Sequence, residues 1–223
     1  MNNLTLEEFE NGIKLYQDEN LYKFTSDAIK LAKFCKPKSS DNVLDMCAGN
    51  GVVGLYAYSV HKFNKIYFNE IQQLMCDLID KNIKLNNLQS KCKVLNKDLN
   101  DLTLDDFDKP LDIIVCNPPY FKVTEKVKQD ISKAMCRHEI STNLEQIISK
   151  ASKLIKSCGK FYLIVPSSRL CECITLLSQN RFAVKSMHIY NTNSKATVAL
   201  IEAVKNAKEG VNINIIKEGV WPN

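Results

Sequence analysis

Residues 43–54 read Val43-Leu44-Asp45-Met46-Cys47-Ala48-Gly49-Asn50-Gly51-Val52-Val53-Gly54. A short apolar run carries an acidic residue near its end, and the pattern G-x-G-x-x-G follows at Gly49, Gly51 and Gly54. Glycine permits a positive φ and lets the backbone approach a ligand closely, while the first turn of a helix offers unpaired N–H groups. The stretch therefore predicts a strand, a glycine-rich turn and the start of a helix, which is the context of a nucleotide site.

Acidic residues follow this strand and the next two predicted strands. Asp45 stands near the end of the first, Glu70 ends the second, and Asp98 follows the third. Ligands of open α/β sheets bind outside the carboxyl ends of the strands, so we expect these carboxylates to converge on one crevice. The negative charge of Asp45 would repel the pyrophosphate of a dinucleotide, whereas it suits the ammonium of a methionine group. Glu70 suits ribose hydroxyls, and Asp98 suits an adenine amino group. Taken singly, each could instead be a helix cap or a turn residue.

Short apolar runs alternate with helical patterns along the chain, which is typical of βαβ units around a mostly parallel sheet. The predicted strands are residues 42–46, 65–69, 92–96, 111–116, 160–165, 183–190 and 197–204, and the predicted helices are residues 26–35, 52–60, 72–86, 143–156 and 168–178. Residues 191–196 are too few for a crossover helix, so the last two strands should form an antiparallel hairpin. A seven-stranded, mostly parallel sheet with such a C-terminal hairpin and helices on both faces is the Rossmann-like fold of class I methyltransferases. Dehydrogenase sheets, in contrast, stay parallel throughout.

The composition describes one globular domain over residues 1–223, with 45% hydrophobic and 25% charged residues. Residues 1–40 are interpreted as a helical extension in which Ser26 caps the helix. The nine cysteines are scattered without a C-x-x-C pair, which indicates free thiols and no metal site. No apolar window is long enough to span a bilayer and the first residues lack a signal-peptide pattern, so we expect a cytoplasmic protein without membrane contact.

The predicted strand at residues 111–116 ends in Asn117-Pro118-Pro119-Tyr120. The two prolines fix two φ angles and remove two donors, so the nearby carbonyls point away from the sheet. An exocyclic aromatic amine or an amide nitrogen is a poor nucleophile, and accepting both of its N–H hydrogens localises the lone pair. The side-chain oxygen of Asn117 and the carbonyl of Pro118 can do so, while Tyr120 stacks on the planar group. A rigid turn alone would not explain the asparagine and the tyrosine.

Residues 45–54 and 117–120 together resemble the S-adenosylmethionine-dependent N6-adenine, N4-cytosine and N5-glutamine methyltransferases. Nearly the whole chain resembles the bacterial tRNA adenine N6-methyltransferases that modify the adenosine 3′ of the anticodon in valine tRNA. Residues 24–32, FTSDAIKLA, are similar to that family's F-x-x-D-A-x-L-L-A segment, residues 45–52, DMCAGNGV, resemble its D-L-C-T-G-N-G-V loop, and residues 137–140, RHEI, resemble its A-R-H-E-I. Lys30 departs from an apolar position of the family pattern, and Met135-Cys136 replaces alanine-rich sequence.

The resemblance implies N6-methylation of a tRNA adenosine, A37, with S-adenosylmethionine as cofactor, tRNA as partner, no obligatory protein partner and a monomeric enzyme. The implied catalytic residues are Asn117, Pro118, Pro119 and Tyr120. The implied cofactor site comprises Thr25, Asp27, Asp45, Cys47, Ala48, Gly49, Gly51, Glu70, Ile71, Asp98, Leu99 and Asn117. Basic residues outnumber acidic ones from Tyr120 to Lys160, which indicates an anionic partner or a solvated lysine-rich face. Residues 121–140 are interpreted as a substrate-binding insert, and the RNA candidates are Lys122, Lys126, Lys128, Lys133, Arg137, Arg169 and Lys195.

Three alternatives stay open. N5-glutamine methyltransferases of release factors share the Asn-Pro-Pro-Tyr motif, but they carry a sizeable helical domain before the glycine loop, whereas 44 residues precede Asp45 here. A guanine methyltransferase of ribosomal RNA would carry an apolar or phenylalanine variant of the motif. A non-catalytic RNA-binding protein with this fold would not need every motif residue that the chemistry requires.

Overall fold

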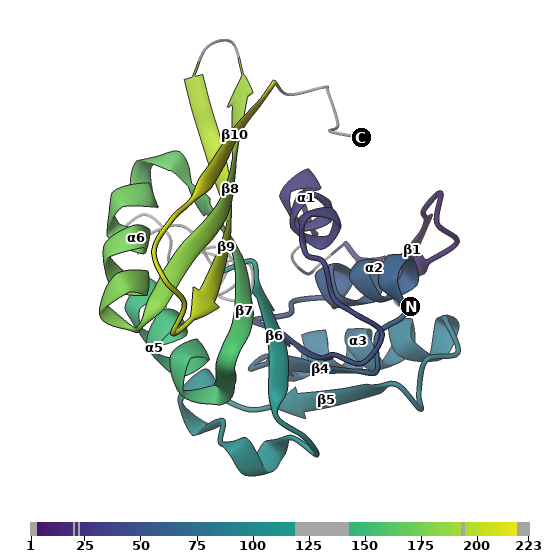
Figure 1. Ribbon diagram of the computed structural model, residues 1–223. Coiled ribbons are helices and arrows are strands. Elements are labelled where there is room, and N and C mark those ends of the chain that lie inside the picture. Colours follow the sequence, from purple (N-terminus) through teal and green to yellow (C-terminus); the bar gives the residue numbers. More distant parts are fainter. Residues whose placement is uncertain (1–3, 20, 22, 119–142, 193–194, 218–223) are drawn as a thin grey trace, which may run out of the picture.

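The computed structural model describes residues 4–19, 21, 23–118, 143–192 and 195–217 (Figure 1). Its main sheet has eight strands, β3 (Asn42–Met46), β4 (Lys65–Glu70), β5 (Cys92–Asn96), β6 (Leu111–Cys116), β7 (Ile155–Pro166), β8 (Phe182–Thr192), β9 (Lys195–Lys205) and β10 (Asn212–Lys217). Their order across the sheet is β10-β8-β9-β7-β6-β3-β4-β5. Every neighbouring pair is parallel except β7–β9 and β8–β9. The Rossmann-like sheet with its antiparallel β8–β9 hairpin is thereby confirmed.

The prediction of seven strands is wrong by one, because β10 adds an eighth strand at the edge of the sheet. This strand pairs parallel with β8, from Asn212 opposite Ser186 to Lys217 opposite Asn191. Only Ile216 of its six residues is buried, whereas Ile213 and Ile215 are 55% and 73% exposed. The alternation Val211-Asn212-Ile213-Asn214-Ile215 is a strand pattern in the sequence, and the prediction overlooked it.

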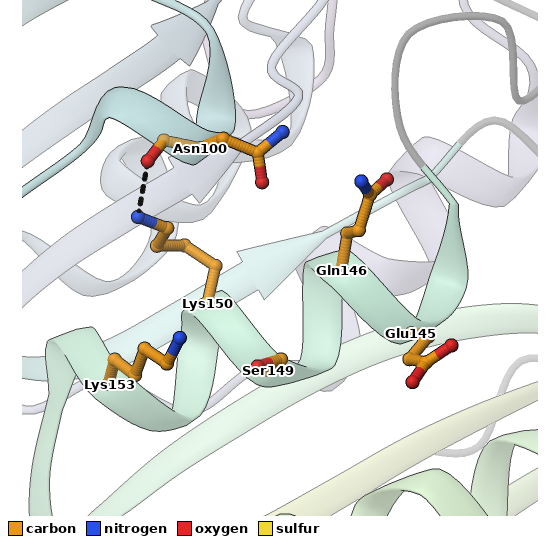
Figure 2. A pocket seen from close by; sticks show the side chains of 6 residues that line it. All are labelled: Asn100, Glu145, Gln146, Ser149, Lys150 and Lys153. Atoms are coloured by element: carbon orange, nitrogen blue, oxygen red, sulfur yellow. Dashed lines mark hydrogen bonds between the residues drawn. The ribbon is translucent and has the colours of Figure 1, made fainter.

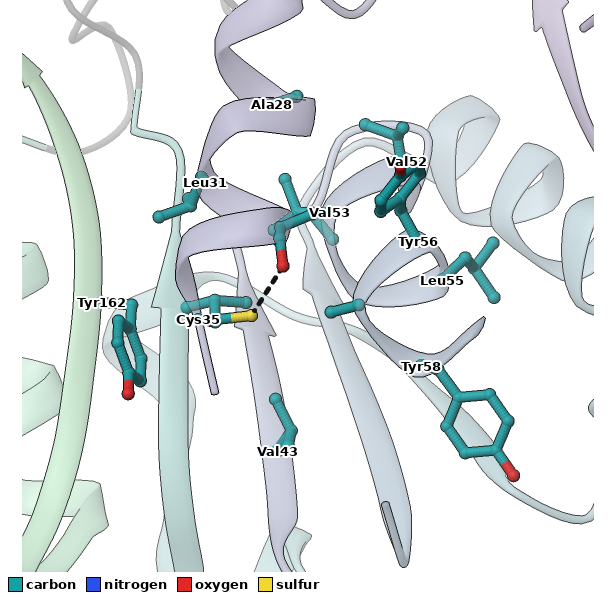
Figure 3. Close-up of a cluster of buried hydrophobic side chains, with 14 of the residues drawn as sticks. Ala28, Leu31, Cys35, Val43, Val52, Val53, Leu55, Tyr56, Tyr58 and Tyr162 are labelled. Carbon is teal, nitrogen blue, oxygen red and sulfur yellow. Dashed lines mark hydrogen bonds between the residues drawn. The ribbon is translucent and has the colours of Figure 1, made fainter. Parts of the chain in front are cut away.

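The helices cover both faces of the sheet, as predicted (Figure 1). On one face, α1 (Ser26–Phe34), α2 (Val52–His61) and α3 (Gln73–Leu85) pack in one hydrophobic cluster with β-strand side chains such as Val43 and Tyr162 (Figure 3). On the other face, α5 (Leu144–Leu154), α6 (Leu170–Gln179) and the short 3-10 turns η1 (Leu99–Asp101) and η2 (Leu104–Asp106) border a second cluster around Leu44 and Ile114. A further 3-10 turn, η4 (Ser167–Arg169), leads into α6.

Residues 1–40 contain a β-hairpin as well as the expected helix, so the helical description of this extension is incomplete. Strands β1 (Leu4–Glu8) and β2 (Lys14–Asp18) form a separate antiparallel sheet. Gly12 adopts φ 81° in the turn, where its N–H donates to the carbonyl of Phe9 at 2.8 Å. Asn-Gly between two short strands is a recognised hairpin signal. Thr25, and not Ser26, stands at the N-cap of α1.

Candidate active site

The carboxyl ends of the central strands place the candidate residues side by side. Met46 of β3 is in register with Asn69 of β4 and with Cys116 of β6. Cys47 and Asn117 directly follow β3 and β6, and Glu70 is the last residue of β4, so all three lie at the edge formed by the carboxyl ends of the strands. The glycine loop, residues 47–51, begins at this edge and leads into α2.

The backbone of the glycine loop depends on left-handed conformations. The φ values are 59° at Cys47, 58° at Gly49 and 79° at Gly51. The two glycines adopt these angles without strain. The N–H of Gly51 donates to the carbonyl of Ala48 at 2.9 Å, and the N–H of Ala48 donates to the carbonyl of Asn69 at 2.9 Å. The loop is thereby tied both to itself and to the end of β4.

Glu70, which the sequence predicts to bind ribose, lies at the end of β4 and contacts the glycine loop. Its Oε2 accepts from the N–H of Gly49 at 2.9 Å, and its Oε1 accepts from the N–H of Gln72 at 2.9 Å. Burial raises the pKa of this carboxyl, and the backbone donors oppose that shift. Each carboxylate oxygen has a further lone pair, so Glu70 can bind the loop and still accept from a ligand hydroxyl.

Asp45 lies beneath the loop. Its side chain is 1% exposed, and Oδ2 accepts from the N–H of Gly54 at 2.8 Å. Burial and the nearby charge of Glu70 raise the pKa of Asp45 to about 8. In this structure the carboxylate therefore fixes the first turn of α2, and contact with a ligand ammonium would require it to become accessible.

Gly54 is required by close packing of α2 against β4. A Cβ at this position would stand 2.2 Å from Cδ1 of Ile66 and 2.7 Å from Cε1 of Phe68. The third glycine of the pattern thus brings the helix onto the sheet, while Gly49 and Gly51 form the turn itself.

Asp98 and Leu99 follow β5, near the predicted adenine end of the site. Oδ1 of Asp98 accepts from the N–H of Asn100 at 2.8 Å, so this carboxylate caps the turn η1, and Leu99 is buried. Ile71, after Glu70, is exposed, and its carbonyl accepts from Nδ2 of Asn96 at 3.0 Å.

A polar hollow of about 180 Å³ lies between η1 and α5 (Figure 2). It is lined by Asn100, Glu145, Gln146, Ser149, Lys150 and Lys153. Lys150 Nζ donates to the carbonyls of Asn100 and Leu102 at 2.7 and 2.9 Å. The hollow therefore borders the turn after Asp98 and is not the crevice of the glycine loop.

The N-terminal candidates lie at the start of α1. Thr25 is exposed at the N-cap, and Oδ1 of Asp27 is 3.1 Å from Nζ of Lys30. Lys30 is buried and also lies 4.8 Å from the ring centroid of Tyr190. These contacts explain how a lysine occupies a position where the family pattern has an apolar residue. The sequence shows the spacing of Asp27 and Lys30 but not the tyrosine.

Only part of the predicted acceptor site falls within the described residues. Asn117 is partly exposed and Pro118 is buried at the end of β6. The other predicted acceptor and RNA-binding residues between positions 119 and 142 lie outside the described residues; they are Pro119, Tyr120, Lys122, Lys126, Lys128, Lys133 and Arg137. Arg169 is 12% exposed, and its guanidinium binds both carboxylate oxygens of Glu172, at 2.9 and 2.7 Å. Lys195 begins β9.

Within the described part of the chain, no group of three or more histidine, cysteine or acidic side chains is arranged to hold a metal ion. The eight cysteines described there are free thiols. Among the same residues, no helix has the length and apolar character needed to cross a membrane.

Comparison with solved structures identifies the class of the fold. The M. jannaschii tRNA m1G37 methyltransferase superposes with a TM-score of 0.67 at 21% identity, covering 93% of this chain and 58% of that chain. M. jannaschii TYW2 in complex with AdoMet superposes with a TM-score of 0.63 at 14% identity, covering 92% and 86%. The fold is that of these methyltransferases.

The family follows from the sequence. The methyltransferase small domain model matches residues 27–198, so the chain belongs to the methyltransferase small domain family and is a methyltransferase. Among curated relatives, the tRNA1(Val) (adenine(37)-N6)-methyltransferase of Shewanella woodyi is 24% identical over 189 residues, which cover 78% of this chain and 77% of the relative. The protein of the same name from Porphyromonas gingivalis (strain ATCC BAA-308 / W83) is 28% identical over 129 residues, covering 57% and 50%.

Proposed function

We propose that this chain transfers a methyl group from S-adenosylmethionine to N6 of an adenosine in tRNA, at position 37. The observation that carries the proposal is the row of Glu70, Cys47 and Asn117 at one sheet edge, because it brings a donor crevice and an acceptor asparagine together. The names of the relatives support the nucleic acid and the position.

The residues around the glycine loop fit the cofactor. No atom lies within 4 Å of the place where a Cβ of Gly49 would stand, so the loop backbone is open to a ligand there, and a buried carboxylate with spare acceptor capacity contacts the loop. The residues proposed to hold it are Thr25, Asp27, Asp45, Cys47, Ala48, Gly49, Gly51, Glu70, Ile71, Asp98 and Leu99, whereas the role proposed for Asn117, at the border of the same site, is to act on the acceptor. The chemistry supplied by bound S-adenosylmethionine is an electrophilic methyl group on a sulfonium sulfur.

The acceptor residues act on the nucleophile. The side-chain oxygen of Asn117 and the carbonyl of Pro118 accept the two hydrogens of the adenine amino group, which localises its lone pair and aims it at the methyl group. No strong base is required, since the methylated amine cation loses its proton readily. An anticodon-loop base must leave its stack to reach this pocket, and stacking on Tyr120 would offset part of that cost.

Asn117→Ala tests this assignment. We expect methyl transfer to fall by roughly 10²- to 10³-fold, as for removal of one polar group that acts in a transition state, while the affinity for S-adenosylhomocysteine stays nearly unchanged. Asn212→Ala, on the exposed strand β10, is the matched control and should retain full activity. Equal loss of transfer and of ligand binding would assign Asn117 to cofactor binding or folding instead.

The substrate is tested by nucleoside mass spectrometry of bulk tRNA from cells with and without the gene. We expect N6-methyladenosine to disappear and to be restored by the wild-type chain but not by Asn117→Ala. Activity on tRNA should also fall steeply with salt, because phosphate contacts release counterions. If the N6-methyladenosine content of tRNA is unchanged while a release factor loses its methylated glutamine, the substrate is a protein.

A further inference from the structure

Two asparagines, Asn82 on α3 and Asn86 at its C-cap, bind the open edge of the N-terminal hairpin. Asn82 accepts from the N–H of Tyr16 at 2.7 Å and donates to its carbonyl at 3.2 Å. One helical turn later, Asn86 accepts from the N–H of Lys14 at 2.9 Å and donates to its carbonyl at 2.6 Å. Each side-chain amide therefore pairs with β2 as a neighbouring strand would.

Asn82 makes a further contact that Asn86 does not make. Its Nδ2 also donates to the carbonyl of Asn50 in the glycine loop at 3.1 Å, and Asn82 is 0% exposed. The N–H of Gly51, in the same peptide unit, donates to the carbonyl of Ala48. Both polar groups of the peptide between Asn50 and Gly51 are thereby held, so this peptide cannot rotate without breaking two hydrogen bonds.

The hairpin also holds the segment that enters α1. Gln17 of β2 is buried, and its Oε1 accepts from the N–H of Phe24 at 3.3 Å. The ring of Phe9, in the hairpin turn, lies 5.7 Å from that of Phe24. Thr25 and Asp27, proposed to border the cofactor, follow directly in the chain. One hydrogen-bonded network therefore joins this segment, β2, α3 and the glycine loop.

We propose that Asn82 is a positioning residue for the cofactor site, which couples the hairpin to the glycine loop. The hairpin lies outside residues 27–198 that the family model matches, so this coupling extends beyond the family domain. The inference rests on the proposed function in one respect, that S-adenosylmethionine binds at the glycine loop. Asn82 itself acts through the carbonyl of Asn50 and touches no ligand.

Asn86→Ala is the matched control for Asn82→Ala. Both variants lose two hydrogen bonds to β2, and Asn86→Ala also loses one to the carbonyl of Asn82, but only Asn82→Ala removes the hydrogen bond to the glycine loop. With S-adenosylhomocysteine as the calorimetric probe, we expect Asn86→Ala to bind as tightly as the wild type. Asn82→Ala should bind about tenfold more weakly, which corresponds to the net value of one hydrogen bond.

Equal affinity of the two variants would overturn the proposal, because Asn82 would then be structural only. A wild-type chain that does not bind the probe would remove the proposed function itself, and the Asn82 proposal with it. If Asn82→Ala does not fold, hydrogen exchange of the wild-type chain tests the coupling instead. Coupling is reciprocal, so the probe should slow exchange of the Tyr16 N–H, and an unchanged exchange rate would refute the coupling.

Discussion

Replacing Asp45 with asparagine should remove a pH-dependent loss of stability from this chain. Asp45 is buried, and within the described residues it forms no ion pair with a basic side chain. Burial, with the charge of Glu70 as a further cause, raises its pKa from the usual 3.8 to about 8, while the N–H of Gly54 opposes the shift. An asparagine of the same shape keeps an acceptor for Gly54 but does not ionise.

The sign follows from the proton bound by each state. Below about pH 4, Asp45 is protonated in both states and contributes nothing. Between about pH 4 and pH 8 the unfolded chain releases the proton while the folded chain keeps it, so rising pH favours unfolding. About four pKa units at ~1.36 kcal/mol each amount to a loss on the order of 5 kcal/mol by pH 8, with no further loss above it.

Urea unfolding from pH 4 to 9 under reducing conditions measures the effect. The free energy of unfolding of Asp45→Asn minus that of the wild type should increase with pH and level off above about pH 8. Glu70, whose pKa is also raised, is present in both proteins, so most of its contribution cancels. A constant difference would refute the raised pKa, and a difference that falls with pH would mean that a cation pairs with Asp45.

Two further substitutions test the same crevice. Gly54→Ala should destabilise the fold by about 1–3 kcal/mol in urea unfolding, because its Cβ would overlap Ile66 and Phe68; an unchanged midpoint would show that α2 can move away from β4. Glu70→Gln should weaken binding of S-adenosylhomocysteine about tenfold in calorimetry, since a neutral amide replaces a charged acceptor of ribose hydroxyls. An unchanged titration would remove Glu70 from the ribose role.

Elements buried on both faces of the sheet could be predicted from the sequence. The predicted bounds of β3 and β6 agree with the structure, as does the antiparallel β8–β9 hairpin. Such strands bury continuous apolar runs between turn signals. β7 begins at Ile155, five residues before its predicted start at Lys160. The prediction missed this first part of the strand because residues 156–158 are exposed and carry no apolar run. The prediction missed the hairpin β1–β2 and the edge strand β10, most of whose residues are partly or fully exposed.

The placement of the strand ends at one edge of the sheet was predictable because it depends on topology, whereas the environment of each side chain was not. Parallel strands bring their carboxyl ends to one edge, and Glu70 indeed contacts the N–H of Gly49. The sequence could not show that Asp45 is enclosed beneath the loop or that the carboxylate of Asp98 caps its own turn. These states depend on which atoms cover each carboxylate after folding.

Polar contacts between distant segments are the features that sequence patterns show least. A buried lysine requires partners, and the spacing of Asp27 and Lys30 on one helix could be read in advance. Tyr190, the second neighbour of Lys30, comes from β8, and the sheet order alone brings it there. The same holds for Asn82, whose amide meets β2 on one side and the glycine loop on the other. An asparagine within a helix ordinarily signals only lower helix propensity, so its role as a link between two segments follows from the folded structure.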